Sequence, residues 1–202
     1  MKRSVKAVLL IVIVLVIDQV SKTWIKNNMQ LGEEFNVLGN FFLIHFTENN
    51  GMAFGLEFSG SYGKLFLTLF RLVAVGVLAY GLHYAIKNRY HWGFIYCISL
   101  ILAGAFGNIV DSVFYGVIYD YAPLFHGRVV DMLYFPVIRG YYPDWFPFWG
   151  GESFIFFRPV FNIADSAISV GVILILIFQK KFFTLERART EKEDLQSEIV
   201  EN

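Results

Sequence analysis

Two aspartates in this chain stand in sequence settings that suit paired carboxyl chemistry. Asp131 lies between apolar residues in Val129-Val130-Asp131-Met132, and Asp165 follows an amide and a small residue in Asn162-Ile163-Ala164-Asp165-Ser166. Two carboxyl groups held close together cannot both ionise cheaply, so one keeps its proton near neutral pH. The ionised member can deprotonate a water molecule, while the protonated member hydrogen-bonds the carbonyl oxygen that the water attacks. Such a pair hydrolyses amides without a metal or a covalent nucleophile.

Each aspartate taken alone also has a purely structural interpretation. Asp165 in the first turn of a helix would favour the positive end of the helix dipole. Asp131 would be a turn or capping residue with Arg128 as its local partner. Asn162 and Asp165 are three positions apart and share a face if both belong to the helix. The chemical interpretation therefore depends on elements that bring the two carboxyl groups together.

Four apolar segments are long enough to serve as those elements, because a hydrocarbon core takes about 20 residues of helix. Of the 202 residues, 56% are apolar and only 17% are charged, against roughly 25% charged in typical soluble proteins. The composition thus favours an all-α membrane protein, with a single integral-membrane domain over 1–183 and a charged cytoplasmic tail over 184–202. The predicted helices are 5–24, 64–86, 92–110 and 160–178, with close packing predicted at Gly76, Gly81, Gly104 and Gly107.

Lysine and arginine set the expected orientation of these helices. They gather at the N-terminus, in the short loop after the second helix and behind the fourth helix, which predicts that both termini are cytoplasmic. The two long loops, 25–63 and 111–159, then face outward. The apolar run 41–47 predicts a strand or hairpin, and hence a small extracytoplasmic β cradle. The second loop holds all five prolines and many aromatic residues, which predicts an interfacial aromatic loop.

Charged side chains at membrane depth cost at least ~2.5–3.5 kcal/mol each, so each one needs an explanation. Asp18, Asp111 and Asp165 fall near the same outer boundary, because two predicted helices end there and the last one begins there. With Asp131 from the outward loop, we expect four carboxylates to converge at one level. The environment of Arg71, within the second helix, remains open. It could face the bundle and pair with a carboxylate or carbonyl, and its depth in the membrane depends on where that helix begins.

Five short blocks, in this order, resemble the lipoprotein signal peptidase family, also called signal peptidase II. The resemblance covers nearly the whole chain apart from the charged tail. The blocks are Asp18-Gln19-Val20-Ser21-Lys22, Asn49-Asn50-Gly51-Met52-Ala53-Phe54-Gly55, Gly104-Ala105-Phe106-Gly107-Asn108-Ile109-Val110-Asp111, Val129-Val130-Asp131 and Phe161-Asn162-Ile163-Ala164-Asp165-Ser166. Each block is weak alone, but five in order on a four-helix topology are specific.

The resemblance implies an aspartic endopeptidase of the bacterial inner membrane with its active site near the outer face. Its substrate would be a diacylglyceryl-modified prolipoprotein, cut just before the lipidated lipobox cysteine, and Asp131 and Asp165 would be the catalytic pair. It implies no cofactor, no metal and contact with membrane lipid. We expect a monomer, because a four-helix protease needs no partner to complete its aspartate pair. The residues expected to bind substrate or support the site are Asp18, Lys22, Asn49, Gly51, Asn108, Asp111, Arg128, Asn162 and Ala164.

The chain departs from the family pattern in two places. The family usually has an arginine directly after the aspartate of its third block, whereas this chain has Ser112. Arg128 and Arg158, in the same outward loop, are the candidates to supply that guanidinium. The segment between Asp131 and Asp165 is also long and proline-rich, which is compatible with an extra outward flap.

Two other classes of protein remain possible from the sequence alone. Intramembrane carboxylates also mark ion pathways, so a small transporter or proton-relay protein is the main alternative. A pathway should place charges across the bilayer, whereas these carboxylates gather at its outer edge. The third option is a scaffold that binds a partner through its aromatic loop. A formal net charge of zero gives no basic field for nucleic acid, and the chain has no H-E-x-x-H zinc motif.

Overall fold

A computed structural model of the chain describes residues 3–50, 60–156 and 158–201. Among them are four helices long and apolar enough to cross a membrane: α1 (Arg3–Asn28), α2 (Gly60–Lys87), α3 (Trp92–Val110) and α5 (Ile163–Glu201). This confirms the predicted number of spanning helices. α5 continues beyond its apolar part, Ile163–Phe183, through the charged tail.

Several helix boundaries differ from the predicted ones, and two of these differences bear on the site. The third helix does not stop at Val110 but continues through a π-helical turn, η1 (Asp111–Tyr115), and the short α4 (Gly116–Ile118). Asp111 is fully buried and ion-paired, so its charge does not end the helix. The fourth helix begins at Ile163 rather than at Val160, because Val160–Phe161 form strand β6.

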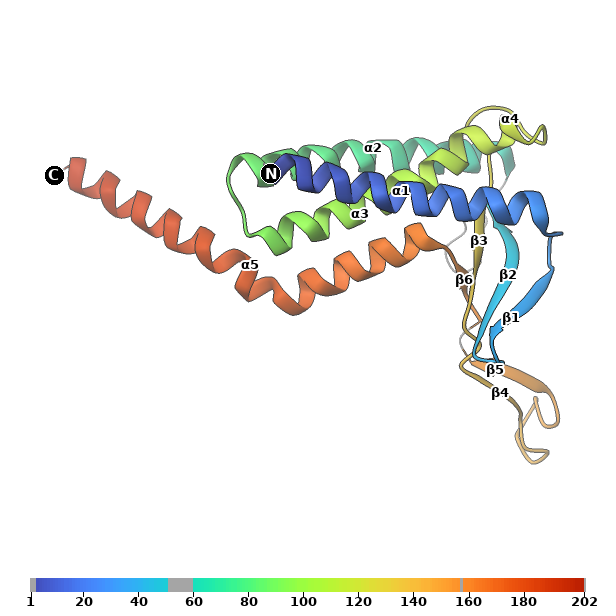
Figure 1. Cartoon of the computed structure of the whole chain (residues 1–202). Coiled ribbons are helices and arrows are strands. Elements are labelled where there is room, and N and C mark those ends of the chain that lie inside the picture. Colours follow the sequence, from blue (N-terminus) through green and yellow to red (C-terminus); the bar gives the residue numbers. More distant parts are fainter. Residues whose placement is uncertain (1–2, 51–59, 157, 202) are drawn as a thin grey trace.

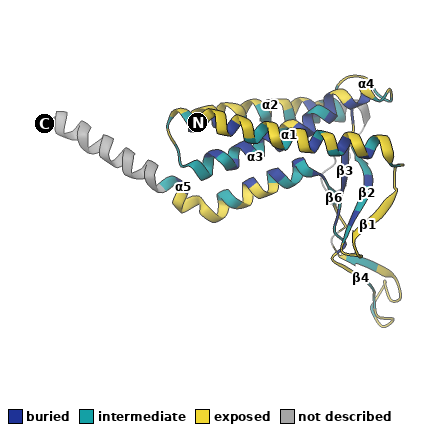
Figure 2. Cartoon of the chain, viewed as in Figure 1, coloured by how far each residue is buried: buried dark blue, intermediate teal, exposed yellow. Residues whose placement is uncertain are grey.

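α3 is the central helix and packs against α1, α2 and α5 (Figure 1). Gly104 and Gly107 are confirmed as close-packing positions on it. A Cβ at Gly107 would lie 2.7 Å from Asp18 Oδ2, and one at Gly104 would clash with the backbone oxygen of Ala164. The same prediction is wrong for Gly76 and Gly81, where a Cβ would meet open space. The outer faces of α1 and α2 are exposed and apolar (Figure 2), as a lipid-facing surface requires.

A four-stranded antiparallel sheet lies across one end of the helices, opposite the end at which both chain termini lie (Figure 1). Its order is β1 (Glu34–Leu38), β2 (Phe42–Asn49), β3 (Val129–Tyr134) and β6. The hairpin β1–β2 confirms the strand predicted in the first loop. Thr47 pairs with Asp131, and Leu133 pairs with Phe161. Because β6 leads directly into α5, this sheet fixes where α5 begins relative to Asp131.

The proline-rich aromatic loop contains a second, two-stranded sheet formed by β4 (Ile138–Tyr141) and β5 (Ser153–Phe156). This hairpin projects to one side of the helix bundle, at the level of the first sheet (Figure 1). Its rings stack on one another, as Tyr142 does on Phe146, yet Phe148 at its tip is 94% exposed. The predicted extra outward segment is therefore an ordered aromatic hairpin.

Candidate active site

Asn162 lies between Asp131 and Asp165 and hydrogen-bonds to both. Its side-chain Nδ2 donates to Asp131 Oδ1 at 2.7 Å, and its backbone N donates to Asp165 Oδ2 at 3.4 Å. Asn162 directly follows β6, the strand that pairs with the Asp131 strand β3. α5 begins one residue later. Strand pairing and a helix start therefore bring together two carboxyl groups that are far apart in the sequence; we call them the aspartate pair.

Asp131 is the more deeply buried member of the pair, with 2% of its surface exposed. Burial, and next the negative charge of Asp165, raise the pKa of Asp131 to about 7. Two amide donors oppose this rise because they stabilise the ionised form: Asn162 Nδ2 at 2.7 Å and Asn49 Nδ2 at 3.3 Å. Asp131 is thus a carboxyl group that holds a proton close to neutral pH.

Asp165 belongs to the first turn of α5 and helps to cap that helix. Asp165 N donates to Asn162 Oδ1 at 2.9 Å, and Asn162 N donates back to Asp165 Oδ2. This is a capping box with aspartate in place of the usual glutamate or glutamine. Asn108 Nδ2 donates to Asp165 Oδ1 at 2.7 Å, and the helix N-terminus favours negative charge here. Asn162 therefore precedes the helix, and does not share a helical face with Asp165.

A buried ion-pair network, formed by Lys22, Asp18 and Asp111, lies behind the aspartate pair; we call it the Lys22 network. The Lys22 ammonium is 0% exposed and contacts Asp18 Oδ2, Asp111 Oδ2 and Asn108 Oδ1, each at 2.9 Å. These three acceptors match the three donors of an ammonium group. Gln19 Nε2 adds hydrogen bonds to Asp111 Oδ1 at 2.9 Å and Asp18 Oδ2 at 3.1 Å. All three charged residues are buried, so they contact protein rather than lipid headgroups.

The two carboxylates of the Lys22 network hold the backbone directly before each member of the aspartate pair. Asp18 Oδ1 accepts a hydrogen bond from Ala164 N at 2.9 Å. Asp111 Oδ2 accepts one from Val130 N at 3.3 Å. Lys22 joins the two carboxylates, and so ties together α1, the end of α3, strand β3 and the start of α5. The separation of Asp131 and Asp165 therefore depends on this network.

Most of the predicted site residues meet at this point, but not all of them. Asn49, Asn108 and Asn162 each donate to the aspartate pair. Arg128 is directed elsewhere: its Nη1 donates to Glu48 Oε2 at 3.0 Å, and its guanidinium lies 5.5 Å from the centre of the Tyr121 ring. Gly51 lies outside the described residues.

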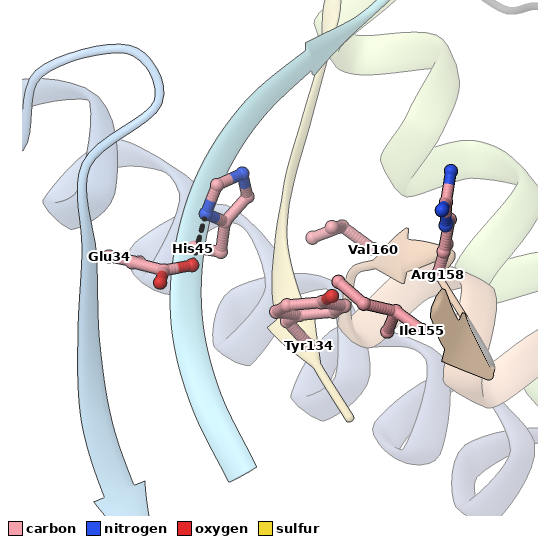
Figure 3. Close-up of a pocket in the computed structure, with 6 residues that line it drawn as sticks. All are labelled: Glu34, His45, Tyr134, Ile155, Arg158 and Val160. Carbon is pink, nitrogen blue, oxygen red and sulfur yellow. Dashed lines mark hydrogen bonds and ion pairs between the residues drawn. The ribbon is translucent and has the colours of Figure 1, made fainter. Parts of the chain in front are cut away.

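Arg158 lines a different hollow, next to the aromatic hairpin. This pocket has a volume of about 390 Å³ and is lined by Glu34, His45, Tyr134, Ile155, Arg158 and Val160 (Figure 3). His45 Nδ1 and Glu34 Oε2 are 3.0 Å apart at its rim. Neither aspartate of the pair lines it. Arg128 and Arg158, the two candidates for the missing guanidinium, therefore lie in other surroundings.

Two contributors were not identified from the sequence. The motif around Asp18 contains Gln19 without predicting its role, although an amide beside Asp18 in an apolar segment is an available signal. The sequence does not predict the partner of Arg71, whose Nη1 donates to Ser112 Oγ at 3.0 Å, because no local pattern links these two positions. Among the described residues, no group of three or more His, Cys, Asp or Glu side chains could hold a metal ion.

Comparisons with known proteins agree on one family. The family model described as signal peptidase (SPase) II matches residues 10–181. A lipoprotein signal peptidase of Porphyromonas gingivalis is 52% identical over 184 residues, covering 83% of this chain and 80% of that protein. One of Amoebophilus asiaticus is 42% identical over 171 residues, covering 80% and 72%. A solved structure described as a bacterial membrane enzyme has a TM-score of 0.62 at 30% identity, covering 87% of this chain and 88% of that one.

Proposed function

This chain belongs to the signal peptidase II family, and we propose that it removes the signal peptide of diacylglyceryl-modified bacterial prolipoproteins through water activated by Asp131 and Asp165. The cut would fall just before the lipidated cysteine. The observation that carries the proposal is the bridge through Asn162, which holds two carboxyl groups of unlike surroundings at one site. A protease of this type needs two such groups in different protonation states.

The surroundings of the two groups support different roles for them. Asp131 has a pKa of about 7, so it holds the proton and hydrogen-bonds the scissile carbonyl oxygen. Asp165 lies at a helix N-terminus and accepts from Asn108 Nδ2, surroundings that suit the group that takes a proton from the attacking water. As the carbon–nitrogen bond breaks, Asp165 returns a proton to the leaving amine. The second oxygen of the new carboxyl group then comes from the water.

The aspartate pair would work near the outer face of the bacterial cytoplasmic membrane. Both termini lie at one end of the helices and the sheet at the other (Figure 1). Lysine and arginine concentrate at the end with the termini, which supports a cytoplasmic position for that end. The scissile peptide of a lipid-anchored substrate lies at the level of the headgroups, where this orientation places the pair.

Purified protein in detergent tests the proposal with two matched substrates. A diacylglyceryl-modified prolipoprotein should be cut, with release of the signal peptide before the modified cysteine, whereas the same chain without the lipid should not. Mass spectrometry of both products locates the cut. Cleavage at another bond, equal cleavage of both substrates, or no cleavage of either would refute the proposal.

The pKa of Asp131 also predicts a pH dependence. Asp131 must keep its proton to hydrogen-bond the carbonyl oxygen, so kcat/KM should fall about tenfold per pH unit above a pH of about 7. Asn49→Ala removes a donor to the ionised form of Asp131, which raises the pKa of Asp131 further. The alkaline fall should therefore move to higher pH in that variant. A rate profile from about pH 5 to about pH 9 measures both effects, and an alkaline limb that stays in place in Asn49→Ala contradicts the assignment.

A further inference from the structure

α2 carries two stripes of opposite character. One is apolar and exposed and faces away from the bundle: Phe66, Phe70, Val73, Val77 and Tyr80. The other consists of Lys64, Thr68 and Arg71, at the spacing that places residues on one helical face. Lys64 Nζ donates to Asn50 O and Thr68 Oγ1 to Phe125 O, each at 3.0 Å. The polar stripe of this membrane helix is therefore directed at the segments around the site.

Arg71 is the member of this stripe that lies nearest to the chemistry. Its Nη1 donates to Ser112 Oγ at 3.0 Å, and the same hydroxyl donates to Asn108 O at 2.9 Å. Asn108 in turn donates to Asp165 at 2.7 Å. Ser112 therefore uses its single proton on Asn108 and offers a lone pair to Arg71, which fixes the orientation of the guanidinium.

Arg71 is linked to the aspartate pair without pairing with it. Its guanidinium is connected to Asp165 by hydrogen bonds through Ser112 and Asn108. Nevertheless, none of the ion pairs among the described residues includes Arg71. A guanidinium has five N–H donors, and the hydrogen bond to Ser112 uses one of them. A charged residue within a membrane helix is costly and commonly marks a substrate pathway, and this guanidinium has further donors to offer a substrate.

We propose that Arg71, oriented by Ser112, is a substrate-binding residue that hydrogen-bonds carbonyl oxygens of the substrate beside the aspartate pair. This inference rests on the proposed function and names a further binding residue for it. The acceptor is neutral, because an anion beside Asp165 and Asp111 would be repelled. Both the peptide backbone and the ester links of a diacylglyceryl group supply such oxygens. Arg71 thus brings from α2 the guanidinium that position 112 lacks.

The competing explanation is that Arg71 only balances charge. The Lys22 network carries two carboxylates for one ammonium, and a nearby cation offsets the excess. In that case Arg71→Gln would lower the stability and the turnover number together. A binding role instead raises KM, because the lost interaction is made with the substrate. The two explanations therefore differ in a measurable way.

The experiment compares wild type with Arg71→Gln, Arg71→Lys and Ser112→Ala. Lys87→Gln is the matched control, since Lys87 is an exposed cation at the far end of the same helix. Each protein is assayed with a diacylglyceryl-modified substrate and with its dialkylglyceryl ether analogue, which lacks the ester carbonyls. Losing a hydrogen bond from a charged donor should lower kcat/KM of Arg71→Gln by about 10- to 100-fold, mostly through KM. Arg71→Lys should recover part of the lost kcat/KM, and Ser112→Ala should show a smaller fall in kcat/KM than Arg71→Gln.

The ether analogue identifies the oxygen. If the loss in Arg71→Gln persists with it, the acceptor is a peptide carbonyl; if the loss disappears, the acceptor is an ester carbonyl. Arg71→Gln within about twofold of Lys87→Gln on both substrates, or a lower kcat at unchanged KM, would overturn the inference. A silent wild type would instead refute the proposed function itself.

Discussion

Asp131→Asn and Asp165→Asn are each expected to lower kcat on the lipidated substrate by about 10³- to 10⁴-fold. Asparagine keeps the shape of the side chain but can neither take a proton from water nor share one. The two groups act as a unit, so the double variant should be hardly slower than either single variant. Release of the signal peptide in detergent, followed over time by gel or mass spectrometry, measures the effect.

Asp144→Asn is the matched control for this experiment. Asp144 is an exposed aspartate in the same long interhelical segment as Asp131, within the turn of the aromatic hairpin. Its variant should cut at the wild-type rate. Thermal unfolding of all the variants separates lost chemistry from lost folding. If an Asp131 or Asp165 variant folds and cuts the substrate at a near-normal rate, the two-aspartate mechanism is wrong.

Lys22→Met is expected to be the most destabilising of the substitutions considered. It leaves Asp18 and Asp111, both fully buried, without their shared cation. Breaking a buried ion pair by removing one partner typically costs about 3–5 kcal/mol. The free energy of unfolding in detergent should fall by about that amount. Activity should fall as well, because Val130 N and Ala164 N are bonded to these two carboxylates.

A compensating variant separates charge from shape in this network. Lys22→Met combined with Asp18→Asn and Asp111→Asn removes all three charges, so part of the lost stability should return, because no unpaired buried charge remains. Lys6→Met, at an exposed position of the same helix, should change the stability by about 0.5 kcal/mol or less. Equal stability losses in Lys22→Met and in the triple variant would contradict an electrostatic origin.

The sequence alone predicts the four spanning helices and most of the residues that the structure brings together around the aspartate pair. Runs of about 20 apolar residues require a membrane and specify helices, and all four spans were found near their predicted positions. The carboxylates near one boundary indicated a common level, because buried charge must be paired. Local signals were less reliable at the ends of elements. The sequence pattern predicts that Asn162 belongs to the last helix. In the structure it caps α5 after the short strand β6.

Which polar groups meet depends on how the helices and strands pack against one another. The sequence does not predict that Asp18 accepts a hydrogen bond from Ala164 N, or that Asp111 accepts one from Val130 N. These contacts join four elements that are distant in the chain. Arg71 could not be matched with Ser112 for the same reason, whereas Arg128, close in sequence to Asp131, is directed toward Glu48. Hydropathy and periodicity predict whether a segment is buried in the membrane and which face of its own helix a residue occupies. Hydrogen bonds between elements depend on how those elements pack. Here the close approach at Gly104 and Gly107 determines how α3 packs against α5 and α1.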